Sequence, residues 1–250
     1  MGESDLAGRT VVVTGASRGI GAAIAEYAAA RGVQLGLCAR GAPALAGSDD
    51  VVSVRADVTD EPAMVDFAKQ VEARFGAIDL WINNAGVLEP IVPVRDLPTD
   101  EFRAHVDVNL TGVLIGTRIF LEHRRRHGGG GVLINISSGA AANAYAGWGA
   151  YCASKAGVER LTEVVALEEQ ASGLRAYSVA PGVVDTEMQT LIRDCSPENF
   201  PEVGRFVEMK QENQFNSGEY VARELFALAF DPARATAEIA VSFPYEYELE

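Results

Sequence analysis

The sequence predicts an α/β fold in which a parallel sheet is covered by helices on both faces. Short β-branched runs alternate with stretches of helical periodicity along the chain. The runs are almost continuously apolar, which is typical of strands buried on both faces. With right-handed crossovers, such strands build a three-layer, doubly wound parallel sheet. Because the 250 residues hold no linker, repeat or low-complexity boundary, a single domain over residues 1–250 is expected.

Seven segments carry the strand pattern. The first reads Thr-Val-Val-Val-Thr and the fifth contains Val-Leu-Ile-Asn-Ile, so neither strand has a regularly polar face. The expected strands are residues 10–14, 33–39, 51–56, 78–83, 132–137, 174–180 and, more weakly, 239–243.

Helix boundaries follow from capping residues. The first helix is expected to end at Gly32, because glycine commonly caps helix C-termini. A second helix is expected to begin after Thr59 or Asp60, and a third to be capped by Thr99. Residues 187–217 are polar, weakly periodic and interrupted by two prolines, so a loop or lid over a substrate is expected there.

The charge balance restricts the partners of the chain. Asp and Glu number 35 against 21 Lys and Arg, which gives a formal net charge of −14 at pH 7. This field repels phosphate backbones and anionic lipid, so neither nucleic acid nor a membrane is expected as a partner. An anionic ligand would have to be held by local donors, such as the amides at a helix start or a few arginines.

The cysteines and the apolar runs indicate a cytoplasmic protein. Cys38, Cys152 and Cys195 lie far apart without metal-ligand spacing, so free thiols and no metal site are expected. Residues 1–8 lack the apolar core of a signal peptide, and no apolar run is long enough to span a membrane.

A glycine-rich turn follows the first expected strand and leads directly into a helix. Without Cβ atoms, such a turn lets a pyrophosphate approach the amides at the positive end of the helix. The alternative is a tight connection with no ligand, but the place of the turn favours dinucleotide binding in a Rossmann arrangement. The expected contacts in this turn are Gly15, Ser17, Arg18, Gly19, Ile20 and Gly21.

The form of the dinucleotide is indicated by the end of the second strand. An acid there would bind a free ribose 2′-hydroxyl, whereas an arginine accommodates a 2′-phosphate. Residues 34–41 contain no acid but include Arg40, and Arg18 could reach the same phosphate. Both could be ordinary surface arginines, but the pattern favours NADP(H) over NAD(H).

Three side chains form a candidate catalytic set. Tyr151 and Lys155 are four residues apart on a predicted helix and therefore share one face. Ser138 follows the fifth strand, at the carboxyl edge where open α/β sheets bind ligands. The alternatives are a solvated helix face for the first two and a turn residue for Ser138.

Six motifs follow one another along residues 10 to about 186. They are the glycine turn, Asn83-Asn84-Ala85-Gly86, Asn109 with Gly112, Ser138, Tyr151-x-x-x-Lys155, and Pro181-Gly182-Val183-Val184-Asp185-Thr186. In order and spacing they resemble the short-chain dehydrogenase/reductase family. The resemblance implies a hydride-transfer enzyme that acts on CH–OH and C=O groups and assembles as a homodimer or homotetramer.

The resemblance also implies catalytic roles. Tyr151 would be the general acid in ketone reduction, and the Lys155 ammonium would stabilise its phenolate. Ser138 would hydrogen-bond the substrate oxygen, and Asn109 would hold a water in the proton relay.

Further residues would contact the cofactor. Asp57 resembles the acid that accepts from the adenine amino group, although an acid at a helix start is an equal alternative. For Asn83 a structural role that ties strands together is expected instead of ligand contact. The contacts implied beyond the glycine turn and Arg40 are Asp57, Val58, Asn84, Ala85, Gly86, Tyr151, Lys155, Pro181, Gly182, Val184 and Thr186.

Residues 147–155, 167–169 and 185–189 resemble the benzil reductase and sepiapterin reductase subgroup, and residues 209–213 resemble benzil reductases more closely. This implies a vicinal dicarbonyl or aryl ketone substrate, with Trp148 stacking on it or serving as a packing anchor. Met188, Gln189 and Met209 in the expected lid could touch the substrate, or the methionines could only pack. The alternatives are an enzyme for another alcohol or ketone, such as a steroid, a sugar or a 3-oxoacyl thioester, and a catalytically silent nucleotide-binding regulator.

Overall fold

The computed structural model describes residues 6–249. Its seven strands form one parallel sheet in the order β3-β2-β1-β4-β5-β6-β7. Each lies within one or two residues of its predicted position, which confirms the α/β fold. The strands are β1 (Thr10–Thr14), β2 (Gln34–Ala39), β3 (Val51–Arg55), β4 (Leu80–Asn83), β5 (Val132–Ile136), β6 (Arg175–Ala180) and β7 (Ala240–Ser242).

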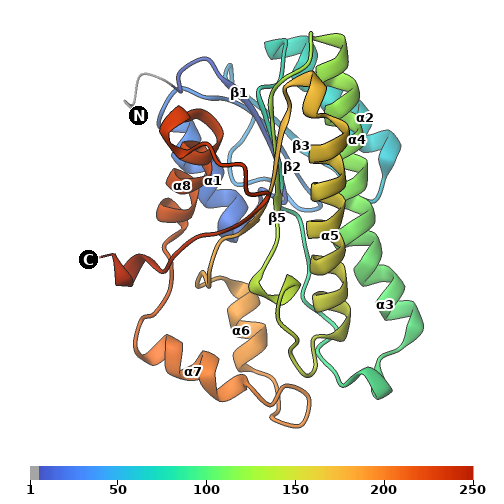
Figure 1. Ribbon diagram of the computed structural model, residues 1–250, viewed down its shortest axis with the longest axis vertical. Helices are drawn as coiled ribbons and strands as arrows, with labels where there is room; N and C mark the ends of the chain where they lie inside the picture. Colours follow the sequence, from blue (N-terminus) through green and yellow to red (C-terminus); the bar gives the residue numbers. More distant parts are fainter. Residues whose placement is uncertain (1–5, 250) are drawn as a thin grey trace.

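Helices cover both faces of the sheet (Figure 1). One face carries α1 (Gly19–Ala29) and α8 (Gly218–Phe230), and the other carries α2 (Glu61–Phe75), α4 (Gly112–Arg126) and α5 (Gly149–Glu168). This is the predicted three-layer, doubly wound arrangement. Because β1 pairs with both β2 and β4, the chain reverses its direction of winding between β1 and β4. In open α/β sheets, ligands bind at the carboxyl side of that point.

The consecutive apolar residues of the strands are divided between the two faces. Val11 and Val13 pack in the core beneath α1 and α8, whereas Val12 packs in the other core together with Trp81. All four side chains are fully buried. A strand with two buried faces has no solvent-exposed side, which explains the continuous apolar runs in the sequence.

The helix boundaries agree with the sequence only in part. Asp60 caps α2 as predicted, since its carboxylate accepts the Ala63 N–H at 3.1 Å. Thr99 is the first residue of α3 (Thr99–Val106) and not its cap, because the extended backbone of Pro98 already occupies the cap position. Gly32 lies in the turn after α1, with a φ of +70°, while the helix itself ends at Ala29.

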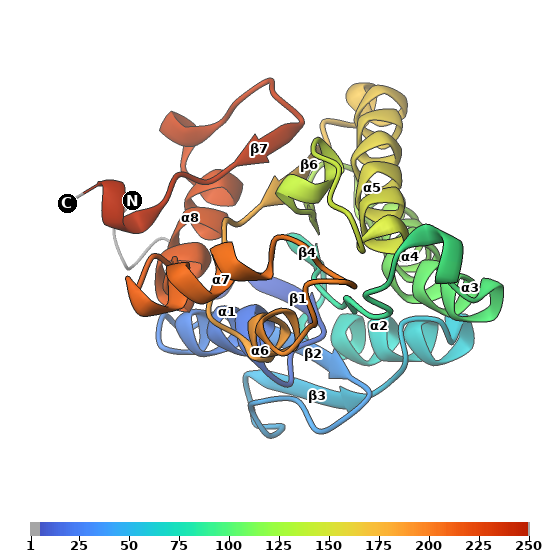
Figure 2. The same ribbon diagram turned by 90° about the horizontal axis from the view of Figure 1, so that it is seen from below.

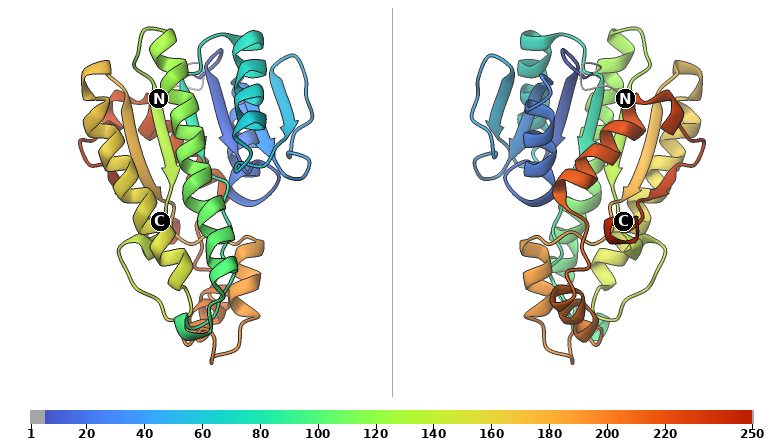
Figure 3. Two further views of the ribbon diagram at one scale, coloured as in Figure 1. Left: turned by 90° about the vertical axis from the view of Figure 1, so that its right-hand side faces the viewer. Right: turned by 90° about the vertical axis from the view of Figure 1, so that its left-hand side faces the viewer.

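Residues 187–217 contain two helices where a loop was predicted. They are α6 (Glu187–Arg193) and α7 (Val203–Gln211), and both prolines of the segment lie between them. Each helix buries only two side chains, so the apolar periodicity is too short to be recognised in the sequence. Figures 2 and 3 show both helices beyond one end of the sheet, on the side from which Figure 2 is viewed.

A buried polar cluster joins β4 to β5 and α4. The Asn83 carboxamide accepts the Trp81 Nε1–H at 2.8 Å and donates to the Asn135 Oδ1 at 2.8 Å and the Thr117 hydroxyl at 3.3 Å. A Cβ on Gly116 would lie 2.2 Å from the Asn83 oxygen, so glycine is required where α4 crosses this cluster. Asn83 thus ties strands together, as the sequence analysis favoured.

Within residues 6–249, no helix combines the length and the apolar composition that crossing a membrane requires. Residues 1–5, which belong to the segment examined for a signal peptide, lie outside the described part of the chain.

Replacing Asn83 tests this cluster. Asn83→Ala should lower the free energy of unfolding by about 2–3 kcal/mol, because it leaves buried groups on Trp81 and Asn135 without a partner. Urea denaturation followed by circular dichroism measures the change. Asn143→Ala, which removes an exposed side chain, is the control. A loss in Asn83→Ala no larger than in the control would refute the structural role.

Candidate active site

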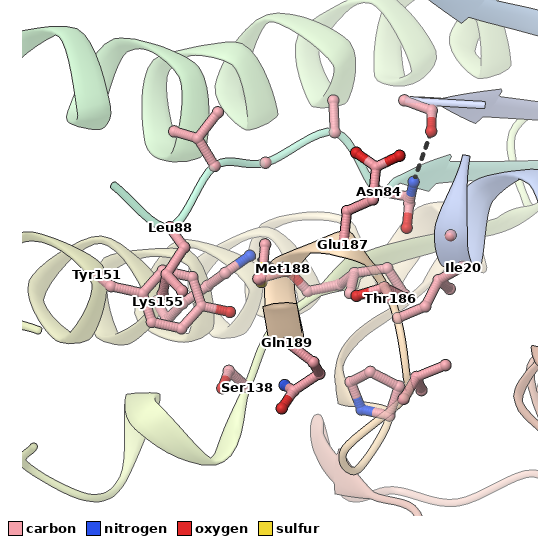
Figure 4. A pocket seen from close by; sticks show the side chains of 18 of the residues that line it. Ile20, Asn84, Leu88, Ser138, Tyr151, Lys155, Thr186, Glu187, Met188 and Gln189 are labelled. Atoms are coloured by element: carbon pink, nitrogen blue, oxygen red, sulfur yellow. Dashed lines mark hydrogen bonds between the residues drawn. The ribbon is translucent and has the colours of Figure 1, made fainter. Parts of the chain in front are cut away.

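A cavity of about 1030 Å³ opens at the carboxyl ends of the strands. Figure 4 shows its central part, where residues from several loops and from α5 and α6 converge. Among the sequence-predicted site residues, Gly21 and Asn109 do not line the cavity within the described chain. Those that line it are Gly15, Ser17, Arg18, Gly19, Ile20, Arg40, Asp57, Val58, Asn84, Ala85, Gly86, Ser138, Trp148, Tyr151, Lys155, Pro181, Gly182, Val184, Thr186 and Met188.

The glycine turn forms one end of the cavity. Gly15 has a φ of +67°, and a Cβ there would lie 2.7 Å from the Ala85 Cα. Gly21 packs inward, where a Cβ would lie 2.3 Å from the Gly15 carbonyl oxygen. Gly21 thus shapes the turn from the side that faces away from the cavity. At the start of α1, the cap residue Arg18 makes no side-chain hydrogen bond to the helix. The N–H groups of its first turn are therefore available to an anionic ligand.

Asn84 fixes this turn against the neighbouring strand. Its carboxamide donates to the carbonyl oxygens of Thr14 and Gly15 at 2.9 and 3.2 Å. In return, the Thr14 hydroxyl accepts the backbone N–H groups of Asn84 and Ala85 at 3.0 and 3.1 Å. These bonds connect the turn after β1 to the segment after β4 and keep this part of the cavity wall in place.

Two arginines and an acid line the same end. Arg40 is exposed, and within residues 6–249 it forms no ion pair. Arg18 is paired with Glu187, the first residue of α6, and both side chains are largely exposed. One oxygen of Asp57 accepts the N–H and the hydroxyl of Thr59 at 3.0 and 2.8 Å. Asp57 therefore forms a turn before α2 and also faces the cavity, which agrees with both alternatives for it.

The middle of the cavity is formed by the start of α5 and the end of β5. Lys155 is buried, and its ammonium donates to the Ile136 carbonyl oxygen at 2.8 Å. The same nitrogen lies 5.7 Å from the centre of the Tyr151 ring. Ser138 forms a hydrogen bond with the Tyr151 side chain, and its hydroxyl accepts the Ala140 N–H at 3.2 Å.

Burial shifts the pKa of both ionisable groups toward the neutral form. It raises the pKa of Tyr151 to about 12, against the opposing effect of the hydrogen bond with Ser138. It lowers the pKa of Lys155 to about 8. Burial and Ser138 are the largest influences on the Tyr151 pKa in this structure, so the stabilisation of its phenolate by Lys155 stays a prediction. At neutral pH the site contains a phenol and an ammonium.

Asn109 lies behind the cavity wall. It occupies a π-helical turn, Asp107–Thr111, between α3 and α4, where the regular α-helical hydrogen-bond pattern changes. Its carboxamide accepts the Val87 N–H and donates to the Val87 carbonyl oxygen, both at 2.8 Å. Asn109 therefore holds the segment after β4, whose residues line the cavity.

His105 supports Asn109 and was missed by sequence reasoning. Its Nδ1–H donates to the Glu89 carbonyl oxygen at 2.8 Å, so Nε2 can accept from the Asn109 amide at 2.8 Å. Burial lowers the pKa of His105, which favours this neutral form. The only sequence signal is the spacing of four residues between the two side chains on one expected helix.

The far end of the cavity is aromatic. Trp148 stacks on Phe200, with ring centres 4.7 Å apart, and meets the Tyr151 ring edge-on at 5.6 Å. The Trp148 indole is buried in this cluster, as expected of a packing anchor, and it also lines the cavity. Sequence reasoning named Gln189 as a candidate substrate contact but missed the other lining residues here, because they come from five separate segments: Leu88, Tyr145, Ile192, Phe206 and Tyr245.

Comparisons with known proteins agree with this geometry. The pattern of short chain dehydrogenases matches residues 9–196. The benzil reductase ((S)-benzoin forming) of Bacillus subtilis (strain 168) is 33% identical over 87% of this chain and 91% of its own. Its namesake from Bacillus cereus is 42% identical over 58% of this chain, a match that spans 59% of that protein. The cis-4-hydroxycyclohexanecarboxylate dehydrogenase of Sinomonas cyclohexanicum is 39% identical over 75% of this chain and 78% of its own.

Solved structures show the same similarity. The KRED1-Pglu enzyme superimposes with a TM-score of 0.85 at 34% identity, covering 93% of this chain and 99% of its own. Levodione reductase superimposes with a TM-score of 0.83 at 27% identity, covering 95% of this chain and 96% of its own.

Proposed function

The chain belongs to the short-chain dehydrogenase family, and from this we propose that it is an NADP(H)-dependent carbonyl reductase whose substrate is a ketone or vicinal dicarbonyl. One observation carries the proposal. Ser138, Tyr151 and Lys155 line a single cavity, between a glycine turn at one end and an aromatic cluster at the other. A silent nucleotide-binding scaffold would not need this arrangement.

The residues of the glycine end fit a nicotinamide dinucleotide, which this family uses as NAD or NADP. Gly15 and Gly19 line the cavity beside the first N–H groups of α1, where a pyrophosphate would be held. Asp57, Asn84 and Thr186 would contact the remaining parts of the cofactor. When bound, the cofactor supplies the hydride.

Two features support NADP over NAD. Residues 34–41 contain no acid, and Arg40 lies directly after β2 with an exposed guanidinium that is available to a 2′-phosphate. Arg18 faces the same cavity and already contacts a carboxylate, that of Glu187, which a 2′-phosphate could replace or join. In an acidic chain, two cations at this end provide the local attraction that a third phosphate requires.

Tyr151 is suited to be the proton donor. With a pKa of about 12, its phenol is protonated at neutral pH, and the hydrogen bond with Ser138 keeps it oriented. As the substrate carbonyl oxygen gains negative charge, Tyr151 would transfer its proton to it and Ser138 would donate a hydrogen bond. The Lys155 ammonium would then stabilise the phenolate. For Asn109, its bonds to Val87 support a positioning role, and the water that the family resemblance implies stays a prediction.

The aromatic end of the cavity supports a vicinal dicarbonyl or an aryl ketone as the substrate. Trp148 and Phe206 line the cavity and belong to one aromatic cluster, which favours a flat apolar substrate. We propose that residues 187–217, with α6 and α7, form a lid over it and that Met188 contacts the substrate. The similarity to a cis-4-hydroxycyclohexanecarboxylate dehydrogenase supports a second candidate, an alicyclic alcohol or ketone.

Assembly and location belong to the same proposal. Leu114 on α4 and Val164 and Leu167 on α5 are exposed apolar residues, and Leu167 is 76% exposed. Burying them between copies of the chain would stabilise a homodimer or homotetramer. The free thiols support a cytoplasmic location, and the net charge of −14 argues against nucleic acid or anionic membranes as partners.

Tyr151→Phe tests the proposed reaction. The variant should reduce benzil with NADPH at least about 100-fold more slowly, because it lacks the transferable proton. Its affinity for NADPH should stay within about threefold of the wild type, since the ring remains in place. Stopped-flow absorbance of NADPH and equilibrium fluorescence titration measure the two quantities. A variant that keeps the wild-type rate would contradict the proposal.

Arg40→Ala tests the form of the cofactor. The KM for NADPH should rise at least about tenfold, because a charge-assisted contact with the 2′-phosphate is lost. The KM for NADH, which lacks that phosphate, should change less than about twofold. Arg103→Ala removes an exposed arginine from α3 outside the cavity and serves as the matched control. A wild-type enzyme that prefers NADH would refute the assignment.

A further inference from the structure

Gln189 is a polar side chain placed among apolar ones at the substrate end. It lies in the first turn of α6, where its backbone N–H donates to the Thr186 carbonyl oxygen at 2.9 Å. The residue is only 8% exposed and lines the cavity. In Figure 4 its carboxamide is directed toward the part of the cavity where Ser138 lies.

The Gln189 carboxamide has no hydrogen-bond partner within residues 6–249. Its Oε1 is buried without a donor, and its Nε2 forms no bond with another described residue. Most buried polar side chains are paired with protein or water, because desolvation without a new bond is unfavourable. An unpaired amide in a ligand cavity is therefore a candidate contact for the ligand.

Apolar side chains lie beside Gln189 at this end of the cavity. Met188 and Ile192, its neighbours on α6, are apolar and line the same cavity, as does Phe206 on α7. Two other polar atoms near the site are also buried without a partner, Trp148 Nε1 and Ser137 Oγ. The Trp148 indole, however, is held inside the aromatic cluster, so Gln189 is the better candidate for a ligand contact.

We propose that Gln189 determines specificity for substrates that carry a second oxygen beside the reacting carbonyl. This inference rests on the proposed carbonyl reduction. Ser138 and Tyr151 hold the reacting carbonyl, and the Gln189 amide N–H donates to the neighbouring carbonyl oxygen. If the amide rotates by half a turn, its Oε1 takes this place and accepts a hydrogen bond from a hydroxyl group beside the reacting carbonyl. A substrate with an adjacent hydroxyl therefore fits as well. The substrate class is thereby narrowed to 1,2-diketones and 2-hydroxyketones.

A simple ketone of the same shape leaves the Gln189 amide unpaired. Sites built around a hydrogen bond discriminate strongly against analogues that lack the matching group, because the buried polar group stays desolvated. The wild-type enzyme should therefore prefer the diketone. Removal of the amide should reduce that preference more than it changes the turnover of the monoketone.

The experiment compares benzil with deoxybenzoin, in which one carbonyl is replaced by a methylene group. The ratio of kcat/KM for the two substrates, measured with NADPH, should fall at least about tenfold in Gln189→Leu. The ratio should also fall in Gln189→Glu, because the glutamate side chain has the same length but donates no hydrogen bond when it is ionised. Gln189→Glu takes the place of Gln189→Leu if the leucine variant fails to fold. Gln211→Leu changes an exposed glutamine at the end of α7 and should leave the ratio unchanged.

The outcomes separate this inference from the function on which it rests. A ratio that stays within about twofold of the wild type in folded Gln189→Leu and Gln189→Glu would overturn the role of Gln189 alone. A wild-type enzyme that oxidises NADPH with neither ketone would overturn the proposed function, and this inference with it.

Discussion

The burial of an ammonium group beside a phenol is the constraint on which the rest of the structure depends. Lys155 is 5% exposed, and a cation so far from water is tolerated only if a fixed acceptor faces it. That acceptor is the Ile136 carbonyl oxygen at the end of β5, which locks the start of α5 against the carboxyl edge of the sheet. The same desolvation keeps the Tyr151 phenol protonated. A protonated donor and a nearby positive charge are what reduction of a carbonyl needs, whereas oxidation of an alcohol would first require the phenol to lose its proton.

The cavity around this pair is built by bonds between segments that are distant in the sequence. Asn84 joins the glycine turn to the end of β4, and Asn109 with His105 holds the next residues of that segment. These side chains therefore fix the wall between the two ends of the cavity. On the opposite side, Asp185 pairs with Arg193 of α6 and Lys210 of α7, which ties both helices to the segment after β6. If α6 and α7 form the proposed lid, a ligand beneath them would meet this wall on one side and two short helices, both tied to Asp185, on the other.

Much of the fold and part of the site can be predicted from the sequence, because they depend on burial and spacing within single strands and helices. The strands are recognisable because residues such as Val11, Val12 and Val13 are all buried, and the α5 pair is recognisable because spacing of four places Tyr151 and Lys155 on one face. His105 and Tyr245 were missed because their positions depend on contacts between distant segments. His105 matters only once the π-helical turn brings Asn109 against Val87, and Tyr245 reaches the cavity from the end of the chain. Likewise α6 and α7 bury too few residues to leave a periodic pattern.

The pH dependence of the reaction tests the central pair most directly. The measurement is kcat/KM for benzil at saturating NADPH, between pH 6 and about 10, for the wild type and for Lys155→Arg. Since the pKa of Lys155 is about 8, wild-type activity should fall above that pH as the ammonium loses its proton. In Lys155→Arg the fall should move upward by more than about one pH unit, because a guanidinium stays charged, whatever the absolute rate of the variant. A wild-type profile that is flat to about pH 10, the ordinary range of lysine, or the same fall in both proteins would contradict the account.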